Sequence, residues 1–211
     1  MYNIKNPDRL DFIRKISKER GIDEIFSIED AKKNDIVKIG NNVKIKDGTV
    51  IGTDGWGYER NEKSELEKFP HYGKVIIGDN VDISSGCTID RGNMHDTIIG
   101  EGTIICKFVS ITCDISIGKN VYVHPMACIG HDAIIGENTI VSSYVDVAGR
   151  CNIGNCTFLA INVILKQGVS IGHNTIVGMG SIVHRDLPDG VIALGNPARP
   201  MKNNIDKKVF K

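Results

Sequence analysis

An aliphatic residue occupies every sixth position of the chain from Ile99 to Val183, without exception. A helix buries positions at a period of 3.6 residues and a single strand at a period of 2, so neither element alone produces this pattern. Gly, Asn and Asp gather between the aliphatic positions, which is typical of a short strand followed by a turn. A run of such units predicts a solenoid, in which each coil buries its apolar side chains only against neighbouring coils.

The fourth residue after each of these aliphatic anchors is small or β-branched, from Thr103 to Ser181. Side chains of that size fit a narrow interior beside a larger anchor. Shorter runs of the same pattern start at Ile39 and at Ile77. Four extra residues then separate Ile89 from Ile99 and predict a bulged corner around residues 93–96. Together these runs predict about seven coils.

The hexapeptides IGKNVY, IGENTI and IGHNTI resemble those of the hexapeptide-repeat family. The resemblance implies an all-β fold, a left-handed parallel β-helix with three six-residue faces and therefore eighteen residues per coil. We expect the β-helix over residues 36–190, with an inserted loop at 53–73 and a C-terminal tail over 191–211. Residues 1–35 lack the pattern and carry helix-start chemistry at Asn6-Pro7, so we expect a short helical N-terminal cap there.

Charge and composition narrow the function. The chain has 211 residues with 26 basic and 26 acidic side chains and no long charge run, which argues against nucleic acid or a membrane surface as the main partner. No apolar segment of about 18 residues predicts a membrane span or an export signal, so we expect a cytoplasmic protein. The six cysteines show no CxxC spacing and are expected to be reduced, with Cys87 and Cys151 pointing inward.

The loop at 53–73 interrupts the repeat and contains the single Trp, Trp56, and Tyr58 between glycines. Long excursions from a regular repeat are usually functional or decorative. IGTDGWGY, GKVIIGDNVDISSGCTIDRG and DTIIGEGT resemble the enzyme that N-acylates a UDP-3-O-acylglucosamine in lipid A synthesis. That resemblance implies that the loop borders the substrate cleft and that Trp56 and Tyr58 contact the acceptor. The alternative is that both aromatic rings only pin the loop to the coil.

Position in the repeat singles out His131, the third residue of IGHDAI, at a corner where side chains point outward. Steps of eighteen residues place Cys113, Gly149 and Gln167 in one column with it. CIGHDAIIG, VAGRCNIG, FLAINVIL and GMGSIVHRD resemble bacterial sugar acetyltransferases that use acetyl-CoA, either N-acetyltransferases of nucleotide-linked 4-amino-sugars or sialic-acid O-acetyltransferases. The resemblance implies that His131 is the general base and that the Gly149 backbone contacts acetyl-CoA.

This role for His131 is chemically sensible, because an amine that attacks a thioester must lose a proton to a group titrating near neutral pH. Asp132 is expected to orient the imidazole or raise its basicity. Adjacent side chains of a strand point in opposite directions, however, so an acidic partner from elsewhere is equally possible. The alternative reading of His131 is a surface histidine that caps a turn.

The two resemblances disagree at two positions. In the lipid A register, Cys113 replaces the catalytic His and Arg150 replaces a later His, which argues against that reaction. A nucleophilic Cys113 has little support, because nothing nearby in the sequence lowers its pKa. In the acetyltransferase register His124 replaces an acceptor-contacting Asn, which leaves the acceptor's identity open.

The remaining histidines have different expected roles. We expect His124 to reach the acceptor across a subunit contact and His95 to reach it from the bulged corner. His71, His173 and His184 are expected to be turn or surface residues.

The phosphates of coenzyme A need cationic partners. The basic residues of the last coils are candidates, although each one alone also fits a solvated surface charge: Lys166, Arg185, Arg199 and Lys202.

The sequence therefore favours an acetyl-CoA-dependent N-acetyltransferase that acts on a nucleotide-linked amino sugar in surface polysaccharide biosynthesis. The resemblance implies a homotrimer with each site between neighbouring chains. Alternatives are an O-acetyltransferase of a sialic acid or related sugar, or an N-acyltransferase with a longer acyl donor. A metal-dependent hydratase like the γ-type carbonic anhydrases needs three His ligands, and Gly136 stands where the third would fall, so no metal is expected. A non-catalytic scaffold is a further alternative.

Overall fold

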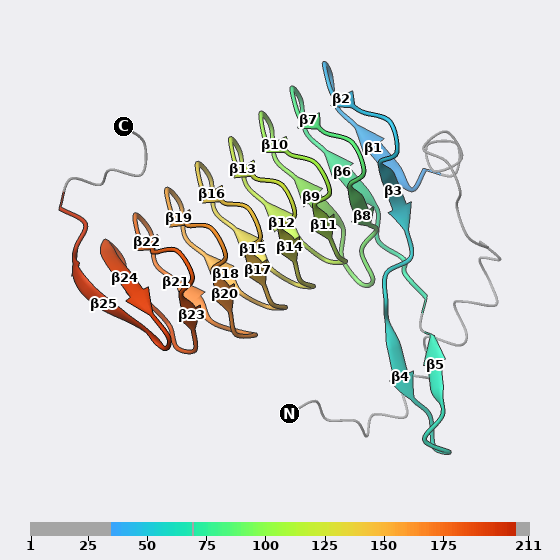
Figure 1. The fold of residues 1–211 in the computed structure, drawn as a ribbon. Coiled ribbons are helices and arrows are strands. Elements are labelled where there is room, and N and C mark those ends of the chain that lie inside the picture. Colours follow the sequence, from blue (N-terminus) through green and yellow to red (C-terminus); the bar gives the residue numbers. More distant parts are fainter. Residues whose placement is uncertain (1–34, 69, 206–211) are drawn as a thin grey trace.

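A computed structural model of the chain describes residues 35–68 and 70–205, and over this range every regular element is a β-strand (Figure 1). Three parallel sheets form the three faces of a β-helix of about seven coils, which confirms the predicted solenoid. Among the described residues there is no helix with the length and apolar character needed to cross a membrane. The predicted N-terminal cap lies outside the described residues, apart from Asp35.

Face 1 consists of β1 (Val37–Ile39), β6 (Val75–Ile77), β9 (Thr97–Ile99), β12 (Ser116–Ile117), β15 (Ile134–Ile135), β18 (Asn152–Ile153) and β21 (Ser170–Ile171). Face 2 consists of β2 (Lys44–Ile45), β7 (Asp82–Ile83), β10 (Ile104–Ile105), β13 (Tyr122–Val123), β16 (Ile140–Val141), β19 (Phe158–Leu159), β22 (Ile176–Val177), β24 (Val191–Gly195) and β25 (Ala198–Asn203). Face 3 consists of β3 (Val50–Thr53), β8 (Thr88–Asp90), β11 (Ser110–Ile111), β14 (Cys128–Ile129), β17 (Asp146–Val147), β20 (Ile164–Leu165) and β23 (Ile182–Val183).

The sixfold pattern describes the core correctly. Within the regular coils each strand pairs in parallel with the strand eighteen residues later, as in Ile111 with Ile129. All fifteen anchors from Ile99 to Val183 are buried, and so are the small residues four positions after them. Where the small residue is Thr, its hydroxyl is satisfied: Thr139 Oγ1 donates to the Gly154 carbonyl at 3.0 Å. A buried hydroxyl without such a partner would destabilise the coil.

The three corners of the β-helix differ in the residues that turn the chain. The first corner joins faces 1 and 2, the second joins faces 2 and 3, and the third joins face 3 to face 1 of the next coil. At the first corner the residue with positive φ is usually Asn, such as Asn120 and Asn138, which tolerates that backbone conformation. Bulky or charged residues take this position elsewhere: Phe108, Met126 and Tyr144 at the second corner, and Asp114, Asp132 and Arg150 at the third. Unfavourable residues in strained turns tend to mark functional surfaces.

Two segments depart from the repeat. The loop at 53–73 leaves face 3 and returns to face 1, so it emerges from the third corner, and it carries the antiparallel hairpin of β4 (Tyr58–Arg60) and β5 (Leu66–Lys68) (Figure 1). The region predicted as a tail also differs from expectation over 191–203. There β24 extends face 2 beside β22, and β25 folds back antiparallel on β24. This hairpin covers the last coil, whose apolar interior would otherwise face water.

The fold analysis predicts a sharp contrast between two neighbours on β18. Ile153→Ala removes a buried anchor and leaves a cavity, so we expect the free energy of unfolding to fall by about 2–5 kcal/mol. Asn152→Ala, whose side chain is exposed on the same strand, should change it by less than about 0.5 kcal/mol. Urea denaturation of both variants measures the difference, and equal losses would contradict the assigned register.

Candidate active site

The third corner brings together most of the residues that the sequence singles out. It carries the loop at 53–73, the bulge at 91–96 and the His131 column. Backbone hydrogen bonds join successive coils along this column, and each coil is one level of it. The Asp132 N–H donates to Cys113 O at 3.2 Å, and the Arg150 N–H donates to His131 O at 2.7 Å. One level further, the Gly168 N–H donates to Gly149 O at 3.0 Å. The predicted column of residues eighteen apart is therefore present.

His131 and Asp132 form a hydrogen-bonded pair, with 2.7 Å between Nδ1 and Oδ2. The sequence left open whether Asp132 or another acid is the partner of His131, because adjacent side chains of a strand point in opposite directions. The two residues lie in a turn instead, and the φ of 57° at Asp132 swings the carboxylate back to the imidazole. An ionised carboxylate can only accept, so in this pair Nδ1 is the donor, and in a neutral imidazole Nε2 then keeps its lone pair. That is the tautomer a general base requires.

The next level of the column frames this pair. Arg150 Nε lies 3.8 Å from the same Asp132 oxygen, so a cation stands behind the carboxylate. A Cβ built on Gly149 would lie 2.4 Å from His131 Nε2, so the imidazole occupies the space that any other residue at 149 would fill. The His131 and Asp132 side chains are 38% and 44% exposed, which leaves both within reach of a substrate.

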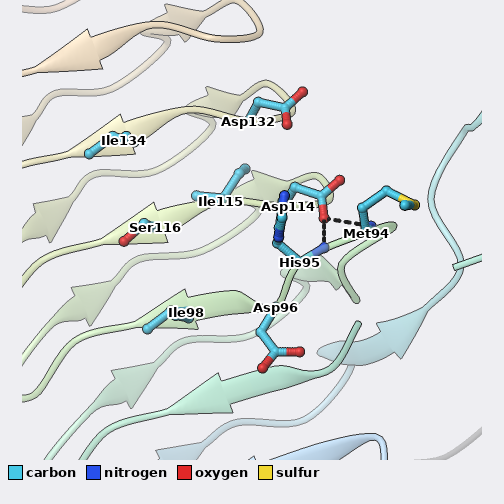
Figure 2. Close-up of a pocket in the computed structure, with 9 residues that line it drawn as sticks. All are labelled: Met94, His95, Asp96, Ile98, Asp114, Ile115, Ser116, Asp132 and Ile134. Carbon is cyan, nitrogen blue, oxygen red and sulfur yellow. Dashed lines mark hydrogen bonds between the residues drawn. The ribbon is translucent and has the colours of Figure 1, made fainter. Parts of the chain in front are cut away.

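A hollow of about 600 Å³ adjoins the pair on the side of the lower-numbered coils (Figure 2). Its polar wall contains His95 and three aspartates one coil apart, and its floor is apolar. The lining residues are Met94, His95, Asp96, Ile98, Asp114, Ile115, Ser116, Asp132 and Ile134. The hollow meets the His131–Asp132 pair at Asp132, whereas the His131 ring is not part of its lining.

Asp114 holds the bulged corner in place. Its Oδ1 accepts the backbone N–H groups of Met94 at 3.0 Å and His95 at 2.8 Å, as Figure 2 shows. The bulge thereby places His95 at the same corner as His131, as its predicted acceptor role needs. Sequence reasoning passed over Asp114, although its position eighteen residues before Asp132 was a usable signal.

Cys113 lies between these levels, and its environment disfavours the thiolate. Burial, reinforced by the nearby carboxylates of Asp114 and Asp132, raises the pKa of the Cys113 thiol to about 12. A thiol needs the opposite surroundings to serve as a nucleophile.

Buried polar contacts anchor the base of the 53–73 loop. The His71 side chain is buried, and its Nε2 accepts the Gly55 N–H at 3.1 Å, so the prediction of a turn or surface role for His71 is wrong. Burial lowers the pKa of His71 and keeps the ring neutral. Arg91 Nε donates to Asp54 Oδ1 at 2.6 Å, and the Thr53 hydroxyl donates to Asp90 at 3.0 Å. None of these partners is evident from spacing, because the loop has no repeat to count along.

Other predicted residues lie apart from the His131 pair. Trp56 is 88% exposed and Tyr58 49% exposed on the loop that this base supports. His124 lies at the second corner, where its ring meets Tyr122 edge-on at 4.4 Å between centroids. Burial lowers the pKa of His124. Face 3 separates it from His131 of the same chain, so within one chain the two do not meet.

Basic residues line the far end of the third corner. Arg185 stands three levels from His131 in the column, about 14 Å at the usual strand spacing. Arg185 and Arg199 line one pocket of about 240 Å³, together with His184, Asp186 and Leu187 and with Pro197 and the start of β25. Lys166 is exposed at an intermediate level. In the described part of the chain, no three His, Cys, Asp or Glu side chains stand close enough to hold a metal ion.

Fold and site together define a three-faced β-solenoid with a histidine–aspartate pair on one corner. Residues 114–149 match the family model described as Bacterial transferase hexapeptide (six repeats), which confirms the predicted repeat. A stretch of 86 residues, 41% of this chain, is 44% identical to UDP-3-O-acylglucosamine N-acyltransferase of Coxiella burnetii. The aligned stretch is 25% of that protein, so the chain spans about a quarter of the length of the curated relatives it matches.

Solved structures share the fold. UDP-N-acetylglucosamine acyltransferase from Campylobacter jejuni superposes with a TM-score of 0.58 at 20% identity, over 84% of this chain and 75% of that one. The S84T mutant of AntD, an N-acyltransferase from Bacillus cereus in complex with dTDP and coenzyme A, gives 0.52 at 18% identity, over 86% and 91%.

The raised pKa of Cys113 predicts an unusual pH profile for its alkylation. Only the thiolate reacts, and below a pKa of about 12 its fraction grows about tenfold per pH unit. The Cys113–iodoacetamide rate should therefore keep rising between pH 7 and 10, whereas the rate of free glutathione levels off in that range. Peptide mapping by mass spectrometry after timed quenching measures both, and a plateau for Cys113 below pH 9 would contradict the assigned environment.

Proposed function

We propose that this chain is an acetyl-CoA-dependent N-acetyltransferase that acts on the amino group of a nucleotide-linked amino sugar in surface polysaccharide biosynthesis. The observation that carries the proposal is the His131–Asp132 pair at an exposed corner of a hexapeptide-repeat solenoid. The imidazole is hydrogen-bonded in the tautomer of a general base, and it stands in a column that leads to two arginines.

In the proposed reaction the acceptor amine attacks the thioester carbon, and its proton passes to His131 Nε2 as the tetrahedral intermediate forms. The Nδ1–H bond to Asp132 stabilises the imidazolium, and the Arg150 guanidinium lies 3.8 Å from the same carboxylate oxygen. The oxyanion needs an N–H donor, and the backbone of Gly149, beside Nε2, is the simplest one. The C–S bond then breaks, and the imidazolium returns the proton to the leaving thiolate.

The donor is proposed to lie along the third corner from Gly149 toward the last coils. The distance of about 14 Å to the level of Arg185 suits an extended pantetheine arm rather than a thioester alone. Arg185 and Arg199 then meet the phosphates of coenzyme A, with Lys166 between them and the thioester. The coenzyme A complex of AntD, on the same fold, supports a CoA donor.

The acceptor is proposed to enter from the side of the hollow. The apolar floor of Ile98 and Ile134 suits the C–H face of a sugar, and its hydroxyls can donate to Asp114 and Asp132. Three carboxylates would repel a diphosphate, so the nucleotide end must point away, toward the exposed Trp56 and Tyr58. His95 then faces the sugar from the bulge.

We propose further that the protein is a homotrimer and that His124 serves the neighbouring chain's site. If face 3 of each chain lines the threefold axis, the third corner of one chain meets the second corner of the next. The second corner carries exposed Phe108, Met126 and Tyr144 at backbone positions that Asn or Gly would fill more easily. Large exposed apolar side chains in that setting are expected of an interface.

A longer acyl donor is the second candidate, because the sequence relative from Coxiella burnetii is named an N-acyltransferase, a name that is not restricted to the acetyl group. The replacement of that family's catalytic histidine by Cys113, whose thiolate is disfavoured, weighs against this reading.

The decisive test follows CoA thiol released from acetyl-CoA with a panel of UDP- and dTDP-linked amino sugars. One amino sugar should turn over, and His131→Ala should lower kcat by about 10²–10⁴-fold with the oligomer intact. The control is His173→Ala, an exposed histidine at the first corner. Turnover that survives His131→Ala would refute the mechanism. Activity confined to sialic acids, or to longer acyl-CoA donors, would select an alternative.

The proposed assembly predicts that the second corner controls the oligomeric state. Phe108→Asn with Tyr144→Asn removes two apolar contacts without straining the backbone, since Asn tolerates positive φ. Analytical ultracentrifugation should show a shift from trimer toward monomer. Met201→Asn, an equally exposed apolar residue on β25, serves as the control and should leave the trimer unchanged. A trimer that persists in the double variant would rule out this corner as the contact.

A further inference from the structure

The backbone at Gly149 contacts the reactive edge of the His131 ring. The three heavy atoms nearest to a Cβ built at 149 all belong to this imidazole: Nε2 at 2.4 Å, and Cδ2 and Cε1 at 2.7 Å each. Such distances are shorter than any ordinary contact, so an alanine and the ring cannot both keep their places. No positive φ is found at Gly149, so the conflict is with the side chain of His131 and not with the backbone.

Two other glycines of the third corner, Gly130 and Gly168, have different surroundings. A Cβ on Gly130 would meet backbone atoms, among them Gly149 N at 2.6 Å, which accounts for a glycine there by coil packing alone. Gly168 follows one coil after Arg150 and meets nothing within 4 Å, but its φ of 78° requires a permissive residue. Gly149 has neither a clash with the backbone of the next coil nor a positive φ, so these two reasons do not explain a glycine at this position.

We infer that Gly149 is a positioning residue: its missing side chain seats the His131 imidazole so that Nε2 points up the column, toward the donor end of the corner. Asp132 fixes the other ring nitrogen from below, with Arg150 beside that carboxylate. The ring is thus held between a carboxylate at one end and bare backbone at the other. This inference rests on the proposed function for its kinetic consequence, but not for its geometry.

This positioning role differs from the contact with acetyl-CoA that the family resemblance implies for Gly149. A glycine that only admits acetyl-CoA would, on substitution by alanine, weaken donor binding and leave the free protein's imidazole undisturbed. If Gly149 positions the ring, the same substitution would displace the imidazole even in the absence of any substrate.

The test compares Gly149→Ala with a matched control, Gly178→Ala. A Cβ at 178 meets chiefly the flexible end of Leu194, and that glycine belongs to the second corner. Long-range ¹H–¹⁵N correlation of His-labelled protein, with the His131 signal assigned by its loss in His131→Ala, reports which ring nitrogen carries the proton. We expect the Nδ1-protonated signature in wild type and Gly178→Ala, and its loss in Gly149→Ala to the degree seen in Asp132→Asn.

The same variants separate the two explanations kinetically once an acceptor is known. Gly149→Ala should lower kcat about 10–100-fold and change KM for acetyl-CoA by less than about threefold, because proton transfer depends on the position of the base. An unchanged His131 signal in Gly149→Ala would overturn the inference, whatever the kinetics. If Gly149→Ala loses the Nδ1-protonated signature of His131 but the wild-type protein acetylates nothing, the positioning role of Gly149 stands and the proposed function is refuted.

Discussion

The parallel hydrogen bonding between successive coils is the constraint on which this molecule depends. Each strand is only two or three residues long over most of the β-helix, so no face is stable without the coils on either side. The register of eighteen residues is kept by buried anchors such as Ile111 and Ile129, because a slip of one residue would turn apolar side chains to solvent. A residue's neighbours are therefore set by counting, and chemistry is arranged in columns along the corners.

The corners are where this regular structure acquires function. A turn that needs positive φ accepts Asn or Gly with little strain, and the first corner uses them. The third corner instead uses Asp132 and Arg150, held in place by coil-to-coil bonds such as the one from the Arg150 N–H to His131 O. The left-handed turn is what allows adjacent residues, His131 and Asp132, to face one another. The backbone conformation of this turn thus sets the geometry of the His131–Asp132 pair.

The segments without a repeat give the site its individual character. The bulge held by Asp114 and the loop anchored by buried His71 and Arg91 both emerge at the third corner, beside the regular column. A solenoid face presents nearly the same surface at every level, so any discrimination among ligands needs irregular structure of this kind. Their bases are held by hydrogen bonds, which at the 53–73 loop are buried or partly buried, and this gives such segments a defined position.

The sequence by itself determined the solenoid and its buried positions, because a strict sixfold pattern fits neither a helix nor a single strand and fifteen anchors specify its phase. The register of eighteen residues followed from the resemblance of its hexapeptides to a known family. The sequence also placed Cys113, His131, Gly149 and Gln167 in one column, since columns follow from counting. Only the tertiary structure decided that Asp132 turns back to His131, that Asp114 holds the bulge, that His71 is buried and that residues 191–203 close the last coil. These features depend on single φ values and on contacts made outside the repeat, and local periodicity contains no information about either.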